Sequence, residues 1–187
     1  DFIAATNNNN NFAAIKVVGN TVYGTAIVCK ENASVTNYDI RTVRLDNDNN
    51  VPEWVSDFGY AELVTEQPMC LDANANHVWV GGNGIQTNRT PLAVHYNASN
   101  GTLVSSYQDP LVGYISTSCN YYQHIYANAD GSAFAAGRHF ITSSNLDWLV
   151  MKINANGTSG WRTTFGNALL SEDQPQAGVG LDKDGNF

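Results

Sequence analysis

An internal repeat with a period near 55 residues runs through the chain and limits what it can fold into. Four short segments of similar sequence each contain an aromatic residue near their end, at Tyr23, Trp79, Phe134 and Phe187. These aromatic residues are 56, 55 and 53 positions apart. Repetition at such a period is typical of folds that place one small supersecondary unit beside the next.

A second set of residues repeats in the same register. The segments Tyr38–Asp46 and Leu146–Asn154 both read as an apolar strand that begins at an aspartate and contains a basic residue. Each is followed by a tryptophan, a Phe-Gly pair and a Gln-Pro pair, namely Trp54, Phe58-Gly59 and Gln67-Pro68, then Trp161, Phe165-Gly166 and Gln174-Pro175. The middle copy, Leu92–Asn97, lacks the tryptophan and the Phe-Gly pair.

Each repeat reads as about four β-strands. Apolar and polar residues alternate in Ile40–Leu45, and Asp-Gly or Asn-Gly pairs at 100–101, 130–131, 156–157 and 184–185 are strong hairpin signals. No stretch carries a sustained helical period with caps. Four-stranded units at this spacing predict an all-β chain of the β-propeller class.

The units resemble the seven-bladed β-propeller repeat family and the closely similar delta-60 repeat. The resemblance lies in the aspartate-led strand, the Phe-Gly pair and an Asp-Gly-Asn turn before a strand that ends in glycine. Asp147–Asn186 matches this pattern best, and Asp39–Gly81 nearly as well. The resemblance implies a fold and not an activity.

At this period the 187 residues hold about 3.4 blades, whereas propellers close with about four to eight. We therefore expect one propeller domain or part of one, with a partial unit at 1–34, units at 35–86 and 87–141, and a truncated unit at 142–187. Either the strands Phe12–Val18 and Thr21–Val28 complete the last blade of a four-bladed ring, or the ring continues beyond this chain. We expect continuation, because Phe187 falls within a predicted strand.

The charge balance excludes some classes of partner. Nine Lys and Arg residues against 17 Asp and Glu residues give a net charge of −8, and the basic residues are scattered. Nucleic acids and anionic membrane surfaces require clustered basic residues, so we expect neither as a partner. No apolar run is long enough for a membrane-spanning helix. The 24 asparagines and the 14% charged residues are typical of a secreted or cell-surface protein.

Five Asn-x-Ser/Thr sequons lie in predicted turns or after strands, at Asn32, Asn88, Asn97, Asn100 and Asn156. A glycan fits on such surface loops, so we expect N-glycosylation in a secretory pathway. The alternative is that a chain rich in asparagine forms sequons by accident.

The three cysteines, Cys29, Cys70 and Cys119, form no C-x-x-C motif, which excludes a zinc knuckle. A disulfide between two of them, with its pairing open, would leave the third thiol free or linked outside this segment. The alternative is that all three are small buried apolar side chains.

No candidate catalytic, cofactor or metal site emerges from the motifs. His77, His95, His124 and His139 lack metal-ligand spacing, although His124 and His139 could meet across a hairpin. Asp182–Asn186 resembles the start of a calcium loop but lacks the distal glutamate, so we expect a hairpin turn. Gly81–Gly84 is expected to be a loop without phosphate-binding function.

The leading hypothesis is a non-enzymatic scaffold or interaction module in an extracellular assembly, whose partners are other subunits or the remainder of the propeller. A carbohydrate-binding module is the first alternative, with its aromatic surface drawn from Trp54, Trp79, Trp148, Trp161, Tyr121, Tyr122 and Tyr126. Among these, Trp54 and Trp161 recur and are expected to pack between blades, and Tyr121-Tyr122 is expected to be exposed. A carbohydrate-active hydrolase or lyase is the second alternative, with paired carboxylates from Glu62, Glu66 and Glu172.

Overall fold

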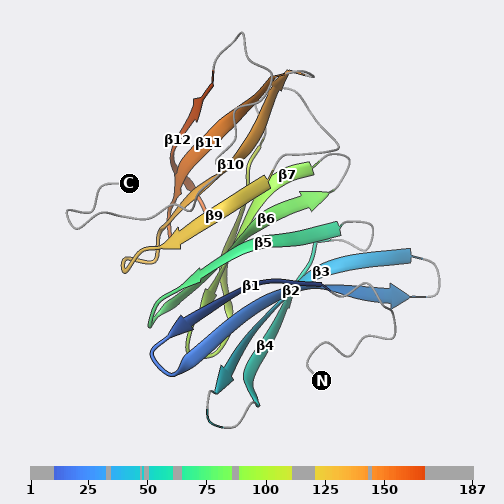
Figure 1. Ribbon diagram of the computed structural model, residues 1–187, viewed down its shortest axis with the longest axis vertical. Coiled ribbons are helices and arrows are strands. Elements are labelled where there is room, and N and C mark those ends of the chain that lie inside the picture. Colours follow the sequence, from blue (N-terminus) through green and yellow to red (C-terminus); the bar gives the residue numbers. More distant parts are fainter. Residues whose placement is uncertain are drawn as a thin grey trace.

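The computed structural model describes residues 11–32, 35–46, 48, 51–60, 65–85, 89–110, 121–142 and 145–166. This part of the chain forms twelve β-strands and no helix, which confirms the all-β prediction (Figure 1). It therefore contains no helix that is long and apolar enough to cross a membrane.

The strands form three antiparallel meanders of four consecutive strands each. The first meander contains β1 (Asn11–Val18), β2 (Thr21–Asn32), β3 (Val35–Asp46) and β4 (Pro52–Phe58). The second contains β5 (Thr65–Ala73), β6 (His77–Ile85), β7 (Arg89–Asn97) and β8 (Leu103–Gln108). The third contains β9 (Tyr121–Ala127), β10 (Ala133–Thr142), β11 (Asn145–Ile153) and β12 (Ser159–Phe165).

The described strands belong to two sheets, and neither sheet closes on itself. A single parallel pairing, between Tyr38 of β3 and Thr65 of β5, joins the first two meanders into an eight-stranded sheet. The third meander is a separate four-stranded sheet. Within the described residues β1 pairs with β2 and β2 pairs with β3, so the alternative in which these strands complete the last unit is not the arrangement observed.

The meanders keep the period of the sequence repeat but begin at a different point. The sequence unit 35–86 contains the last two strands of the first meander and the first two strands of the second. The unit 87–141 likewise combines β7 and β8 with β9 and most of β10. The repeated sequence motif therefore spans the contact between two neighbouring meanders.

Successive meanders pack face to face, and the first strand of the second meander, β5, packs against both β1 and β9 (Figure 1). The core consists of two clusters, one in each contact. The first cluster joins Tyr23, Ile40, Trp54 and Phe58 to Val78, Val80, Leu92, Val94 and Tyr96. The second joins Trp79, Ala93 and Tyr107 to Ile125, Ala133, Leu149 and Met151.

Each meander thus has two faces, because side chains alternate along a strand. We call the side that faces the next meander in the chain the front face, and the opposite side the back face. Tyr23, Trp79 and Phe134 hold the same front-face position, opposite the first strand of their own meander. The repeated aromatic residue is therefore a packing residue, and Tyr23 and Trp79 are both buried.

The predicted loop Gly81–Gly84 is wrong, because β6 continues through it to Ile85. A Cβ atom on Gly82 would collide with the carbonyl oxygen of Gln67 on β5. A Cβ atom on Gly137 of β10 would collide in the same way with the carbonyl oxygen of Tyr121. The glycines that follow the repeated aromatic residues thus allow the close approach of the first strand of each meander.

The spacing between the leading aspartate and the Phe-Gly pair also has a structural reason. A Cβ atom on Gly59 would meet the carboxylate of Asp39, and one on Gly166 would meet the carboxylate of Asp147. Glycine is therefore needed where the chain passes over each aspartate. In the second meander, whose sequence lacks the Phe-Gly pair, the buried Asp109 accepts a hydrogen bond of 3.1 Å from Nε of Arg162 on the third meander.

Candidate functional site

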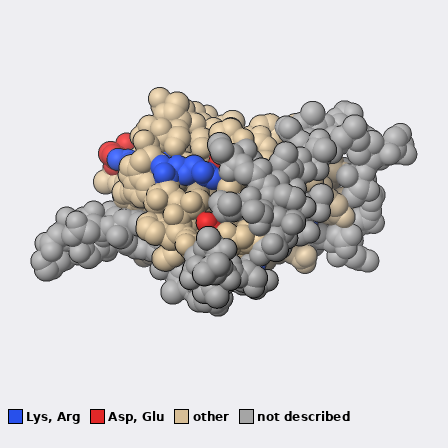
Figure 2. Space-filling model, turned by 90° about the horizontal axis from the view of Figure 1, so that it is seen from above, with Lys and Arg blue, Asp and Glu red and all other residues tan. Residues whose placement is uncertain are grey.

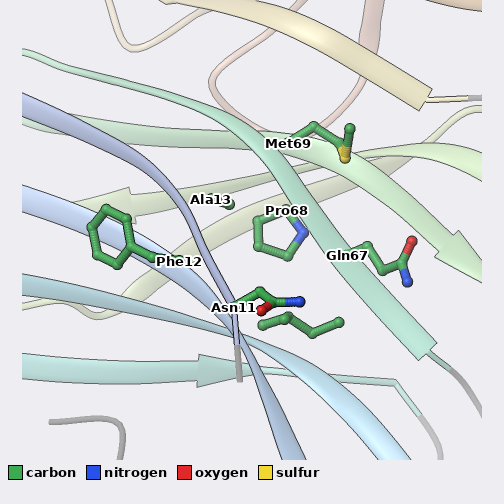
Figure 3. Close-up of a pocket in the computed structure, with 7 residues that line it drawn as sticks. Asn11, Phe12, Ala13, Gln67, Pro68 and Met69 are labelled. Carbon is green, nitrogen blue, oxygen red and sulfur yellow. The ribbon is translucent and has the colours of Figure 1, made fainter. Parts of the chain in front are cut away.

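A hollow of about 280 Å³ lies between β1 and β5 (Figure 3). The described residues that line it include no acid, base or nucleophile; they are Asn11, Phe12, Ala13, Ile27, Gln67, Pro68 and Met69. Its polar groups are the two side-chain amides, and the rest of its lining is apolar. These described residues suit a neutral ligand.

The structure pairs two histidines, but not the pair considered from the sequence. In the β9–β10 register, His124 lies opposite Ala136, three residues from His139. The pair that forms is His77 with His95, whose Nδ1 and Nε2 atoms are 3.1 Å apart across β6 and β7. The sequence alone does not predict this contact, because it depends on the register in which β6 pairs with β7.

Both histidines of this pair are held by the contact between the second and third meanders. Nδ1 of His95 lies 3.2 Å from the carbonyl oxygen of Ala155, so it must carry a proton and donate. Nε2 of His95 then accepts from Nδ1 of His77. The His95 ring stacks on Trp79, with ring centroids 4.4 Å apart. The pKa of His95 is lowered to about 4, mainly by burial and to a smaller extent by the neighbouring His77, while the hydrogen bond to Ala155 acts in the opposite direction.

The carboxylates that lie within the described residues do not form a catalytic pair. Glu66 is fully buried and accepts a hydrogen bond of 3.1 Å from the backbone amide of Tyr60, just after the Phe-Gly pair. Its predicted companions Glu62 and Glu172, and the loop Asp182–Asn186, lie outside the described residues. Within the described ranges, no group of three or more His, Cys, Asp or Glu side chains is placed to hold a metal ion.

Three of the five sequons lie in described hairpin turns. The Oδ1 atoms of Asn97, Asn100 and Asn156 each accept hydrogen bonds from the backbone amide and the hydroxyl of the Ser or Thr two residues later. Asn100 and Asn156 are exposed, and each precedes a glycine with positive φ. Asn32 ends β2, and Asn88 lies outside the described residues.

Two of the three cysteines lie within the described residues. Cys29 is buried in β2. Cys70 lies against the second core cluster, and its thiol points to the carbonyl oxygen of Tyr122 at 3.8 Å. Burial raises the pKa of the Cys70 thiol, which disfavours the reactive thiolate. Cys119 lies outside the described residues, so the predicted pairing keeps its status as a prediction.

The aromatic residues proposed for a sugar-binding surface divide into buried and exposed ones. Tyr122 is fully buried, so the expectation of an exposed Tyr121-Tyr122 pair is wrong. Trp54 and Trp79 are buried between meanders, and their Nε1 atoms donate to the carbonyl oxygens of Ala98 at 3.0 Å and Gly131 at 3.1 Å. These tryptophans are therefore part of the packing.

Part of the front face of the third meander, in contrast, is exposed, although Ala136 and Val150 at its centre are buried. Trp148, Trp161 and Phe165 are 37, 43 and 53% exposed. Phe134 and Trp161 contact each other, as do Trp148 and Phe165, with ring centroids 5.9 Å apart in both pairs. We call Phe134, Trp148, Trp161 and Phe165 the front aromatic face. The expectation that Trp161 packs between blades is not met within the described residues.

Part of the back face of the first meander is also exposed and apolar, whereas Ala26, Val28 and Val43 on the same face are buried. Ile15 and Val17 of β1 are 61 and 60% exposed, and Val55 of β4 is exposed on the same side. We call these three residues the back apolar face. Figure 2, a view from above the orientation of Figure 1, shows few charged side chains on the described part of the surface. The two ends of the stack are therefore its main candidate interaction surfaces.

No protein-family model matches the chain, and no curated protein is significantly similar to it. The resemblance to propeller repeats accordingly rests on the residues of the chain itself.

Proposed function

We propose that the chain forms consecutive blades of a β-propeller that acts outside the cell as a non-enzymatic, N-glycosylated scaffold or interaction module. The observation that carries the proposal is the stacking of three four-stranded meanders with equivalent residues at both contacts. This is the way in which propeller blades pack around a ring. The exposed end faces then provide the surfaces for partners.

The environment of the polar groups supports a non-enzymatic role. Asp72 accepts from the amide of Ala127 at 2.9 Å and pairs with Lys16 at 2.7 Å, so it links strands of all three meanders. The carboxylate of Glu66 accepts a hydrogen bond from the backbone amide of Tyr60, which follows β4. Catalytic groups need access to substrate, whereas these carboxylates are buried and bound to the fold.

The two equivalent turns support glycosylation as part of the same proposal. Asn100 and Asn156 occupy the same position in successive hairpins, and both are exposed. Their Oδ1 atoms are bound within the turn, so a glycan on the amide nitrogen would point to solvent without breaking these bonds.

The test is the intact mass of the chain after secretion from a eukaryotic host, before and after enzymatic removal of N-glycans. We expect a mass above 20.3 kDa that falls to about this value on removal. The variant Asn156→Asp keeps the acceptor oxygen for Thr158 and should lose one glycan. A mass of 20.3 kDa throughout would contradict the proposal.

A carbohydrate-binding module is the second candidate, favoured by the exposed Trp148 and Trp161. It predicts that neutral oligosaccharides quench tryptophan fluorescence and that Trp161→Ala abolishes the effect. Phe165→Glu on the same face serves as a comparison, because it removes an aromatic ring without removing a tryptophan. Absence of quenching at millimolar sugar would exclude this candidate.

A further inference from the structure

We infer that the pairs Asn100-Gly101 and Asn156-Gly157 are sites of spontaneous deamidation, each of which stays unreactive while its hairpin is docked on the preceding meander. Opening of a contact then permits a modification that prevents the hairpin from docking again. The reaction needs only water, so it also takes place in a chain without glycans. An N-glycan on either asparagine would block it, because the nitrogen that must leave would be bonded to the sugar.

The chemistry uses only the asparagine, the glycine and water. The backbone nitrogen of the glycine attacks Cγ of the asparagine, and its proton passes through water to the side-chain nitrogen, which leaves as ammonia. Water then opens the resulting cyclic succinimide at either carbonyl carbon. One opening gives aspartate, and the other gives isoaspartate, in which the main chain runs through the former side chain. Glycine favours the attack because it has no Cβ atom beside its nitrogen.

In both hairpins the attacking nitrogen is held in a hydrogen bond. The amide of Gly101 donates to the carbonyl oxygen of Asn97 at 2.9 Å, and the amide of Gly157 donates to that of Asn154 at 2.9 Å. An amide that donates in this way keeps its proton, whereas the attack requires the proton to leave. The first step is therefore suppressed while these hydrogen bonds are intact.

The side chain that would be attacked is also held in place. Oδ1 of Asn100 accepts from the backbone amide and the hydroxyl of Thr102, at 3.0 and 2.8 Å. Oδ1 of Asn156 accepts the same two bonds from Thr158, at 3.2 and 2.7 Å. These bonds fix the orientation of each side chain, whereas ring closure must bring Cγ within bonding distance of the glycine nitrogen. Both asparagines are exposed, so the conformation of the hairpin, and not access of water, limits the reaction.

Each hairpin is fixed by a serine on the last strand of the preceding meander. Ser56 of β4 donates to the carbonyl oxygen of Gly101. Ser105 of β8 donates to the carbonyl oxygen of Ala155 at 2.9 Å. The two contacts use separate residues, so opening of one contact frees one Asn-Gly pair and leaves the other held.

Isoaspartate would prevent the hairpin from docking again, because it lengthens the main chain by a methylene group. Gly101 is buried and lies so close to the ring of Trp54 that a Cβ atom on it would collide with that ring. A Cβ atom on Gly157 would collide with the carbonyl oxygen of Ser106. Neither hairpin has space for a longer main chain. Aspartate keeps both the main-chain length and the acceptor oxygen, so it allows docking.

The test compares the folded, unglycosylated 187-residue chain with the same chain unfolded in guanidinium chloride, both in mildly alkaline buffer. Peptide mapping by mass spectrometry follows deamidation at each asparagine. We expect both Asn-Gly pairs to react at least about tenfold more slowly in the folded chain. Equal rates in the two states, or no reaction in the unfolded chain, would overturn the inference.

The same hairpins contain internal controls. Asn97-Ala98 and Asn154-Ala155 should stay unmodified in both states, because the side chain of alanine hinders the attack by its nitrogen. Reaction at these pairs as fast as at the Asn-Gly pairs in the unfolded chain would contradict the assignment of the sites.

Two matched serine variants test the role of each contact. Ser56→Ala should accelerate deamidation at Asn100 and leave Asn156 unchanged, whereas Ser105→Ala should do the reverse. Each variant is the control for the other, and the unaffected site reports that the rest of the fold is intact. Acceleration at neither site, or at both sites in a variant that keeps the circular dichroism of the wild type, would overturn control by the individual contacts.

Hydrogen exchange tests whether the modification keeps the contact open. Chains with isoaspartate in place of Asn100, separated by ion exchange, should exchange the amide of Gly101 faster than unmodified chains. The variant Asn100→Asp, which reproduces the other product, should exchange this amide as slowly as the unmodified chain. Slow exchange in the isoaspartate chains would show that the hairpin docks again and would overturn this part of the inference.

Discussion

At the scale of single residues, His95 is a titratable group that lies in the contact between the second and third meanders. It is buried, stacks on Trp79 and donates through Nδ1 to Ala155 of the third meander. Both ring nitrogens are used in this neutral form, because Nε2 accepts from His77. A proton on Nε2 would replace this hydrogen bond by a repulsion between two donors.

We expect His95 to make the stability of the fold sensitive to acid. Its pKa of about 4 in the folded chain lies below the ordinary value of 6.5, so the unfolded chain binds more protons between these values. The contribution of His95 to the free energy of unfolding is therefore constant above pH 7 and falls as the pH drops from 6.5 to 4. Urea unfolding of the wild type and of His95→Gln at several pH values measures this slope.

The variant should show a shallower decline in stability than the wild type over this range. His124→Gln is the control, because His124 is only half-buried, although burial also lowers its pKa. An equal slope in the wild type and in His95→Gln would contradict the assigned tautomer and burial.

At the scale of elements, Asp72 connects the first strands of the three meanders. Its Oδ1 atom pairs with Lys16 of β1, and its Oδ2 atom accepts from the amide of Ala127 at the end of β9. Since Asp72 is itself on β5, one carboxylate fixes the relative positions of β1, β5 and β9. Apolar packing alone would leave these positions less well determined.

We expect Asp72→Ala to lower the free energy of unfolding by about 1–3 kcal/mol, because it leaves a buried amide without an acceptor. The control is Asp57→Ala, which removes a partly exposed ion pair with Arg41 inside one meander and should cost about 0–1 kcal/mol. Hydrogen exchange should also accelerate at Ala127 in Asp72→Ala only. Equal losses in the two variants would contradict the linking role of Asp72.

The elements also show what could be predicted from the sequence. The Asn-Gly and Asp-Gly pairs correctly placed three hairpins, whose glycines Gly101, Gly131 and Gly157 have φ values of 70, 83 and 78°. The run Gly81–Gly84 was misread because glycine ordinarily weakens a strand. Here β5 passes so close to Gly82 that a larger residue would not fit, a constraint that is visible only in three dimensions.

At the scale of the whole molecule, the repeat predicts how units pack but not which faces remain uncovered. Trp54 and Trp161 are equivalent in the sequence, yet one is buried and the other is exposed. The difference arises because the first meander has a neighbour on its front face, whereas Trp161 lies on the last described meander. Position within the stack, and not local sequence, decides the exposure of these residues.

This difference predicts how the four tryptophans respond to a soluble quencher. Acrylamide should reach Trp148 and Trp161 but not Trp54 and Trp79, because only the first two are exposed. The double variant Trp148→Phe/Trp161→Phe should retain fluorescence that acrylamide hardly quenches. Quenching of all four tryptophans would contradict the packing of the meanders.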